Sequence, residues 1–228
     1  MNFFHKILYK FYAIKPSFSQ CGEDLIIDHI FRQLKKNEIF YLDIGTNDPQ
    51  TTNNTYLFYK NGHKGICVEP NPALIKQIKK VRPRDLCLNL GVALSEESDL
   101  DFYVMEPHTL STFSKSDAEE MSLSSTVKID KVIKVPTLRI NEIFSSYVKD
   151  KLDFLSIDVE GLNEEIIIDL DLTKYRPTVV CIETITFSEV GDAKKLNRII
   201  DKFLANNYFL YADTYLNTIF IDKQQWKY

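Results

Sequence analysis

Short apolar runs alternate with amphipathic stretches along most of this chain from residue 39 onward. The apolar runs predict strands, which fall at 39–45, 62–70, 85–94, 151–160, 178–184, 208–213 and 217–222. Stretches of helical periodicity between them predict helices near 55–60, 72–80, 139–148, 162–171 and 193–206. Runs such as FLSI and VVCI are apolar at consecutive positions, which is typical of a parallel sheet covered on both faces. The alternation therefore predicts an α/β fold whose seven-stranded, mostly parallel sheet has helices on both faces and an antiparallel strand near the C-terminus.

The middle of the chain departs from this alternation. Residues 101–105 and 131–138 also predict strands, but residues 106–130 are rich in Ser, Thr and acidic side chains. That segment is too long for a plain connection, and we expect it to form a functional loop or lid. One domain over residues 19–228 accommodates all of these elements.

Residues 1–18 predict an amphipathic helix ahead of this domain. The first 16 residues hold three lysines and no acid, and their apolar side chains recur at roughly helical spacing. One interpretation is a helix docked on the domain or on a partner subunit, so that an oligomer is an open question. The alternative is an interfacial helix that makes a peripheral contact with an anionic membrane. The segment lacks the apolar core and cleavage site of a secretory signal, and no run approaches the ~20 apolar residues of a membrane span.

Charge and cysteine content narrow the choice of partner and compartment. The chain has 28 Lys and Arg against 32 Asp and Glu, a net charge of −4, which argues against a nucleic-acid partner. Its four cysteines have no metal-site spacing, and three lie within apolar runs, so we interpret them as reduced. Reduced cysteines favour a cytoplasmic protein, with membrane association through residues 1–18 as the further option.

Acidic residues follow four of the predicted strands. In open α/β sheets, ligands bind beyond the carboxyl ends of the strands. Asp43 ends the first strand and Glu69 the second, while the two later strands end in Asp158-Val159-Glu160 and in Glu183. A dinucleotide site would need the GxGxxG pattern after the first strand, but this chain has only Gly45 there, followed by Asn47-Asp48-Pro49.

These features favour a cationic nucleoside without phosphates, and S-adenosylmethionine fits them. Asp43 suits its amino group, Gly45 permits close backbone approach, and Glu69 suits the two ribose hydroxyls. Acids at strand ends also serve as helix caps, so each feature is weak by itself. Two other hypotheses remain: a protein that binds S-adenosylmethionine without catalysis, and a nicotinamide-dependent sugar oxidoreductase.

Five motifs together resemble the FkbM family of methyltransferases, over about residues 18–222. They are SQCGED (19–24), YLDIGTNDP (41–49), GICVEPNP (65–72), DFLSIDVEG (153–161) and VVCIET (179–184). The resemblance implies a class I methyltransferase (Rossmann-like) fold, S-adenosylmethionine as donor and transfer to a hydroxyl oxygen. Family members commonly act on sugars or secondary metabolites. Asp48-Pro49 departs from the family pattern, because many relatives have a small residue and Gly there.

Several further residues are candidates for cofactor binding. Gln20 and Glu23 belong to the N-terminal motif, which either closes over the methionine end of the cofactor or caps a helix that begins near Glu23. Asn47 and Pro70 follow the first two strands, and Asn54 is a candidate for the cofactor's carboxylate.

Transfer to a hydroxyl needs an in-line acceptor and a base or metal to activate it. Asp158 and Glu160 are the candidate base or acceptor-orienting acids, and the alternative is that they cap the next helix. Asp158 and Glu183, at neighbouring strand ends, are also candidate ligands for Mg²⁺. His108, in the 106–130 segment, is a candidate to close over the acceptor and take its proton. The expected acceptor is a small molecule or a glycan, most simply a sugar of a surface polysaccharide precursor, which the basic N-terminus would allow to be lipid-linked.

Overall fold

The computed structural model describes residues 15–95, 98–186 and 193–227. The N-terminal helix expected at 1–18 lies outside the described residues, apart from 15–18. Within the described ranges, no helix is both long and apolar enough to cross a bilayer.

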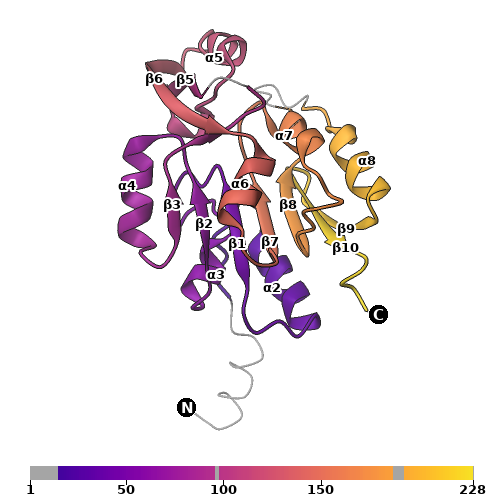
Figure 1. The fold of residues 1–228 in the computed structure, drawn as a ribbon. Helices are drawn as coiled ribbons and strands as arrows, with labels where there is room; N and C mark the ends of the chain where they lie inside the picture. The colour runs from indigo at the N-terminus through magenta and orange to yellow at the C-terminus, as the bar shows by residue number, and fades with distance from the viewer. Residues whose placement is uncertain (1–14, 96–97, 187–192, 228) are drawn as a thin grey trace, which may run out of the picture.

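The centre of the molecule is a seven-stranded sheet (Figure 1). Its strands are β1 (Phe40–Ile44), β2 (Lys64–Val68), β3 (Leu86–Leu88), β7 (Phe154–Ile157), β8 (Val179–Glu183), β9 (Tyr208–Asp213) and β10 (Asn217–Asp222). They lie in the order β3-β2-β1-β7-β8-β10-β9, and β10 is antiparallel to both of its neighbours while the others run parallel. This confirms the predicted mostly parallel sheet with an antiparallel C-terminal strand.

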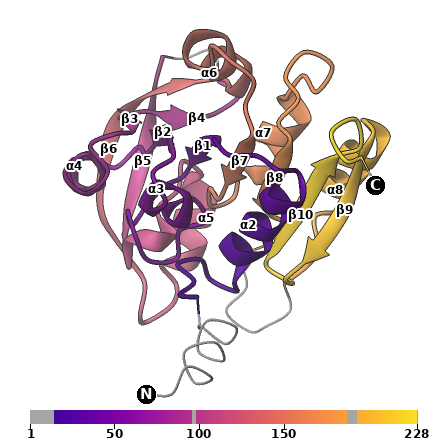
Figure 2. The ribbon, with the colours of Figure 1, turned by 90° about the horizontal axis from the view of Figure 1, so that it is seen from below.

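Three helices cover each face of this sheet, as the consecutive apolar positions of its central strands require. On one face lie α2 (Glu23–Gln33), α3 (Tyr56–Lys60) and α4 (Pro72–Val81). On the other lie α6 (Ile140–Tyr147), α7 (Asn163–Asp169) and α8 (Asn197–Ala205), which pack on the larger core cluster. The view along the sheet separates the two layers (Figure 2).

Local sequence sets where α4 begins. Asn71 caps it by accepting a hydrogen bond from the Ala73 N–H at 3.0 Å, and Pro72 occupies the first turn, where its missing N–H is harmless. The VEPNP motif therefore ends a strand and starts a helix within five residues.

A second, three-stranded sheet departs from the sequence-based expectation. It contains β4 (Gly91–Val92), β5 (Asp99–Glu106) and β6 (Lys128–Leu138), in the order β4-β6-β5. The apolar run at 85–94 is thus two strands in two sheets and not one strand. The break falls at Asn89, whose side-chain amide donates to the carbonyls of Glu69 and Pro70 while the chain changes partners.

The segment 106–130 is largely ordered structure. It contains the end of β5, a 3-10 turn η1 (His108–Leu110), the helix α5 (Lys115–Met121) and the start of β6. Met105, Ala118, Met121 and Val127 form a small core of its own. Figure 1 places α5 with β5 and β6 above the carboxyl ends of the parallel strands, where it can wall a site. That it moves as a lid stays a prediction.

The aromatic core between the sheet and α2–α3 gives a stability test. Phe154 is fully buried and packs edge-on against Phe58 at 5.4 Å and Phe31 at 6.5 Å between ring centroids. We expect Phe154→Ala to lower the free energy of unfolding by about 3–5 kcal/mol, measured by urea denaturation. Leu204→Ala, at a position 47% exposed, should lose less than about 1 kcal/mol. Equal losses in the two variants would contradict this account of the core.

Candidate active site

A pocket lies at the carboxyl ends of the parallel strands, around the point where the strand order reverses between β1 and β7. The space between its walls, counted out to its open mouth, is about 900 Å³, which suits a ligand of cofactor size. Its lining brings together nine of the predicted site residues, namely Gln20, Gly45, Asn47, Glu69, Pro70, His108, Asp158, Glu160 and Glu183.

Gly45 brings the loop after β1 against the end of β7. Its φ is +79°, and a Cβ there would lie 1.9 Å from the carbonyl oxygen of Asp158, closer than any side chain can approach. The Asp158 N–H in turn donates to the Ile44 carbonyl at 3.0 Å. Only glycine permits this contact, so the pocket floor and the first acid of IDVEG are fixed relative to each other.

Glu69 ties the loops after β1 and β2 together. One carboxylate oxygen accepts from the Asn47 N–H at 2.9 Å and the other from the Asn71 N–H at 2.7 Å. Burial raises the Glu69 pKa to about 7, although these two hydrogen bonds oppose the rise. Asn47 has φ +51°, and its buried side-chain oxygen has no hydrogen-bond partner among the described residues. The pocket wall thus holds a buried acceptor that a ligand can satisfy.

The carboxylate of Asp43 lies outside the pocket in which the sequence led us to expect it. It accepts from the Thr55 hydroxyl at 2.8 Å and lies 3.6 Å from an Arg82 nitrogen. Successive residues of a strand point to opposite faces, and Asp43 points to the face covered by α2–α4 while Ile44 borders the pocket. Direct contact between this carboxylate and a cofactor amino group therefore has no support in the geometry.

Glu23 and Asn54 also lie outside the pocket lining. Asn54 donates to the Ser156 hydroxyl at 3.2 Å, while Glu23 accepts from Thr214 at 2.7 Å and Asn217 at 3.0 Å. Burial acts to raise the Glu23 pKa, but its hydrogen bonds outweigh burial and lower it. These two residues anchor the segments around the pocket.

Three carboxyl groups gather where β7 and β8 end. Burial is the main cause of a raised pKa in each: about 6 for Asp158, about 8 for Glu160 and about 9 for Glu183. Mutual repulsion adds to the effect, since Asp158 raises the pKa of both glutamates. Only Glu183 has a side-chain partner in the described structure, accepting from Asn163 at 2.9 Å. The cluster therefore retains protons near neutral pH.

The carboxyl cluster does not have the arrangement of a metal centre. Over residues 15–95, 98–186 and 193–227, no group of three or more His, Cys, Asp or Glu side chains is placed to share one ion. The predicted Mg²⁺ ligands Asp158 and Glu183 thus lack a third acidic or imidazole partner in ligating position.

The 106–130 segment supplies the wall opposite the acids. Thr112 donates to the Glu160 carbonyl at 3.0 Å, and the ring of Phe113 fills the space where Gly91 has no side chain. His108 borders the pocket but is solvent-exposed. The sequence analysis missed Thr112, Phe113 and Asn163, because nothing in their spacing sets them apart from ordinary loop residues.

The raised pKa values predict that stability depends on pH. A carboxyl group with a raised pKa keeps its proton in the folded state at pH values where the unfolded chain has lost it. The stabilisation that such a group adds to the folded state is complete below its pKa in the unfolded chain, which is near 4.5 for Glu183. It is lost as the pH rises toward the folded-state pKa of about 9. We expect the free energy of unfolding of the cofactor-free protein to fall by roughly 1 kcal/mol or more between pH 5.5 and 8.5.

The matching variant is Glu183→Gln, which keeps an acceptor for Asn163 and removes the titration. It should flatten this pH dependence, whereas Glu119→Gln, at an exposed position on α5, should leave it unchanged. Urea denaturation at a series of pH values measures both, and equal pH profiles for Glu183→Gln and wild type would contradict the assignment.

Comparison with known proteins agrees with this architecture. The profile of the Methyltransferase FkbM domain matches residues 43–211, and no curated protein matches the chain significantly. Among solved structures, a TehB-like SAM-dependent methyltransferase from Corynebacterium glutamicum is similar at 12% identity and TM-score 0.47, with 96% of each chain covered.

Two others are described as a caffeoyl-CoA O-methyltransferase from Staphylococcus aureus and an O-methyltransferase from Klebsiella pneumoniae. The first has 11% identity, TM-score 0.46 and coverage of 95% of this chain and 90% of the other. The second has 10% identity, TM-score 0.47 and coverage of 95% and 94%. The family match confirms the predicted methyltransferase family, and the sheet of the described residues confirms the predicted α/β fold. Because the family match spans well over half of its length, the chain belongs to the Methyltransferase FkbM domain family.

Proposed function

We propose that this protein transfers the methyl group of S-adenosylmethionine to a hydroxyl oxygen of a neutral sugar or glycan. The observation that carries the proposal is the position of Asp158. Its carboxyl group borders the pocket beside the Gly45 loop, and no hydrogen bond or ion pair to it occurs among the described residues. A half-buried acid at a pocket wall, without a protein partner among the described residues, is suited to act on a bound ligand.

The pocket suits S-adenosylmethionine in three respects. Gly45, held against the Asp158 carbonyl, lines the pocket with backbone alone, the Asn47 oxygen can accept a hydrogen bond, and Glu69 can accept from ribose hydroxyls. When bound, the cofactor supplies an electrophilic methyl group on a positively charged sulfur. Gln20, which borders the same pocket, is placed to contact its methionine portion.

Asp158 is the group best placed to receive the hydroxyl proton. Its pKa of about 6 leaves it ionised at neutral pH, while the values of about 8 and 9 keep Glu160 and Glu183 mainly protonated. A protonated carboxyl group donates a hydrogen bond, so the two glutamates can hold acceptor oxygens while Asp158 removes the proton. His108 is a second candidate base, although its exposure gives it no fixed orientation.

The charge of the pocket favours a neutral acceptor. Among the described residues its lining includes four carboxyl groups and no Lys or Arg, and the ionised Asp158 would repel phosphate or carboxylate groups near the reacting hydroxyl. A sugar presents several hydroxyls and no charge, and so fits this wall. A lipid-linked glycan precursor is compatible when its phosphates lie outside the pocket, and contact of residues 1–18 with a membrane would favour such an acceptor.

Substitution of Asp158 tests the reaction class. Asp158→Asn keeps the shape of the side chain and removes the base, so we expect methyl transfer to fall by about 100-fold or more. Binding of S-adenosylmethionine, measured by calorimetry, should persist within about tenfold. Transfer is followed as radiolabelled methyl incorporated into a polysaccharide-precursor extract, with Asp201→Asn on exposed α8 as the control of unchanged rate.

Three outcomes would contradict this proposal. Full activity of Asp158→Asn would show that Asp158 is not the base. Loss of turnover in EDTA would show that the reaction needs a metal such as Mg²⁺, which the geometry does not support. Binding without transfer to any extract would favour a non-catalytic S-adenosylmethionine-binding protein.

A further inference from the structure

Arg82 is a fully buried charged side chain near the pocket, and it is not part of the pocket wall. It is the C-terminal cap residue of α4, and its side chain is 0% exposed. All three guanidinium nitrogens are engaged: Nε with Asp85 at 2.8 Å, Nη1 with Asn53 at 3.2 Å, and Nη2 with Thr55 at 2.8 Å. Nη1 also lies 3.6 Å from Asp43.

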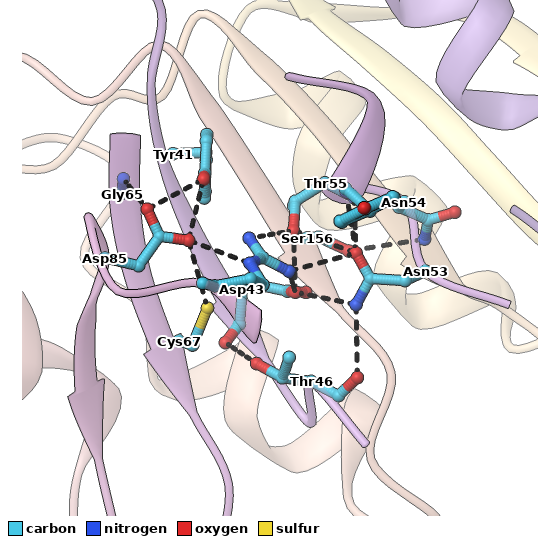
Figure 3. Close-up of polar contacts among 12 residues, drawn as sticks. Tyr41, Asp43, Thr46, Asn53, Asn54, Thr55, Gly65, Cys67, Asp85 and Ser156 are labelled. Atoms are coloured by element: carbon cyan, nitrogen blue, oxygen red, sulfur yellow. Dashed lines mark hydrogen bonds and ion pairs between the residues drawn. The ribbon is translucent and has the colours of Figure 1, made fainter. Parts of the chain in front are cut away.

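The two acids that face Arg82 are held in place from other directions. Asp85 accepts from the Tyr41 hydroxyl at 2.8 Å and the Gly65 N–H at 2.8 Å, while Asp43 accepts from Asn53 and Thr55 (Figure 3). Burial raises the Asp43 pKa, and Arg82 opposes the rise. A guanidinium between two fixed carboxylates has little freedom to move, because its fork of donors matches only one geometry.

Asn53 connects this cluster to the cofactor loop, residues 46–55. Its amide nitrogen donates to the carbonyls of Thr46 at 3.1 Å and Asp48 at 3.3 Å (Figure 3 draws the first). Its oxygen accepts from Arg82 and from the N–H groups of Thr55 and Tyr56. Arg82 thus orients one side chain that fixes both ends of the loop.

The same loop carries the part of the pocket wall that has an unsatisfied acceptor. Asn47 lies between Thr46 and Asp48, has a left-handed backbone, and presents its unpartnered oxygen where the wall is formed. A left-handed non-glycine residue is unfavourable by itself and persists only when its surroundings hold it. The carbonyls on either side of Asn47 are the two that Asn53 holds.

We infer that Arg82 is a positioning residue for the cofactor: through Asn53 and Thr55 it sets the conformation of residues 46–55, so that affinity for S-adenosylmethionine depends on a side chain that never touches it. The inference rests on the proposed function for the identity of the ligand. It also accounts for Asp43 at the start of the loop, whose charge balances Arg82.

A second buried ion pair provides a matched control. Arg176 binds Asp222 at 2.7 Å, and Asp222 is 1% exposed. Arg176 also donates to the carbonyls of Leu172 and Asn206, and none of these partners lies in the pocket lining. Weakening this pair disturbs stability without reaching the loop 46–55.

The experiment compares Arg82→Lys, Thr55→Val and Arg176→Lys with the wild type. Lysine keeps the positive charge of Arg82 but cannot make the three guanidinium hydrogen bonds. Valine removes the Thr55 hydroxyl at nearly constant shape. If one of these two variants does not fold, the other still tests the inference. The measurements are urea denaturation, calorimetric titration of S-adenosylmethionine, and hydrogen exchange of the amides of residues 46–55 without ligand.

We expect all three variants to lose stability. Only Arg82→Lys and Thr55→Val should bind S-adenosylmethionine about tenfold or more weakly and exchange the loop amides faster. The inference would be overturned if both Arg82→Lys and Thr55→Val had the affinity and the loop exchange of the wild type. It would also be overturned if Arg176→Lys weakened binding of S-adenosylmethionine equally. Absence of wild-type binding would overturn the proposed function instead, and the ligand-free exchange data would still decide whether Arg82 orders the loop.

Discussion

The approach of one backbone to another at Gly45 governs the rest of this site. The loop after β1 passes so close to the carbonyl of Asp158 that a single additional carbon would not fit. Because β1 and β7 are neighbours at the reversal of strand order, this contact brings the loop that carries Asn47 against the segment that carries Asp158 and Glu160. The strand order makes β1 and β7 neighbours, and the missing Cβ of Gly45 allows the loop after β1 to approach the Asp158 carbonyl closely.

The acidic cluster shows how function opposes stability in this fold. Asp158, Glu160 and Glu183 share a space that water reaches poorly, and each makes ionisation of the others less favourable. A core built only for stability would place apolar or paired side chains there. The free protein tolerates these groups because the two glutamates keep their protons near neutral pH, which leaves Asp158 as the ionised member.

Much of the architecture could be predicted from the sequence. Apolar runs located the strands of the large sheet, and the acids that end them located most of the pocket. The strand prediction failed where hydrogen bonding overrides local pattern, because Asn89 turns the run at 85–94 from one sheet to another. Strand alternation directs Asp43 to the face opposite the pocket, which the spacing of acids alone does not indicate.

Arg82 was invisible to sequence analysis for a related reason. It follows two lysines at the end of an amphipathic helix, where a basic residue normally faces solvent and favours the helix C-terminus. Its partners Asn53 and Thr55 lie 29 and 27 positions earlier in the chain. Only the fold brings them together, so no local spacing could have revealed the cluster.

The Asp43–Arg82–Asp85 arrangement also restricts how this family member can diverge. Replacing Arg82 by a neutral residue leaves two buried carboxyl groups without their cation, which is far more unfavourable than exchanging the whole set for well-packed neutral side chains. Substitutions at these positions are therefore strongly non-additive. The cluster is therefore exchanged more easily as a unit than one residue at a time.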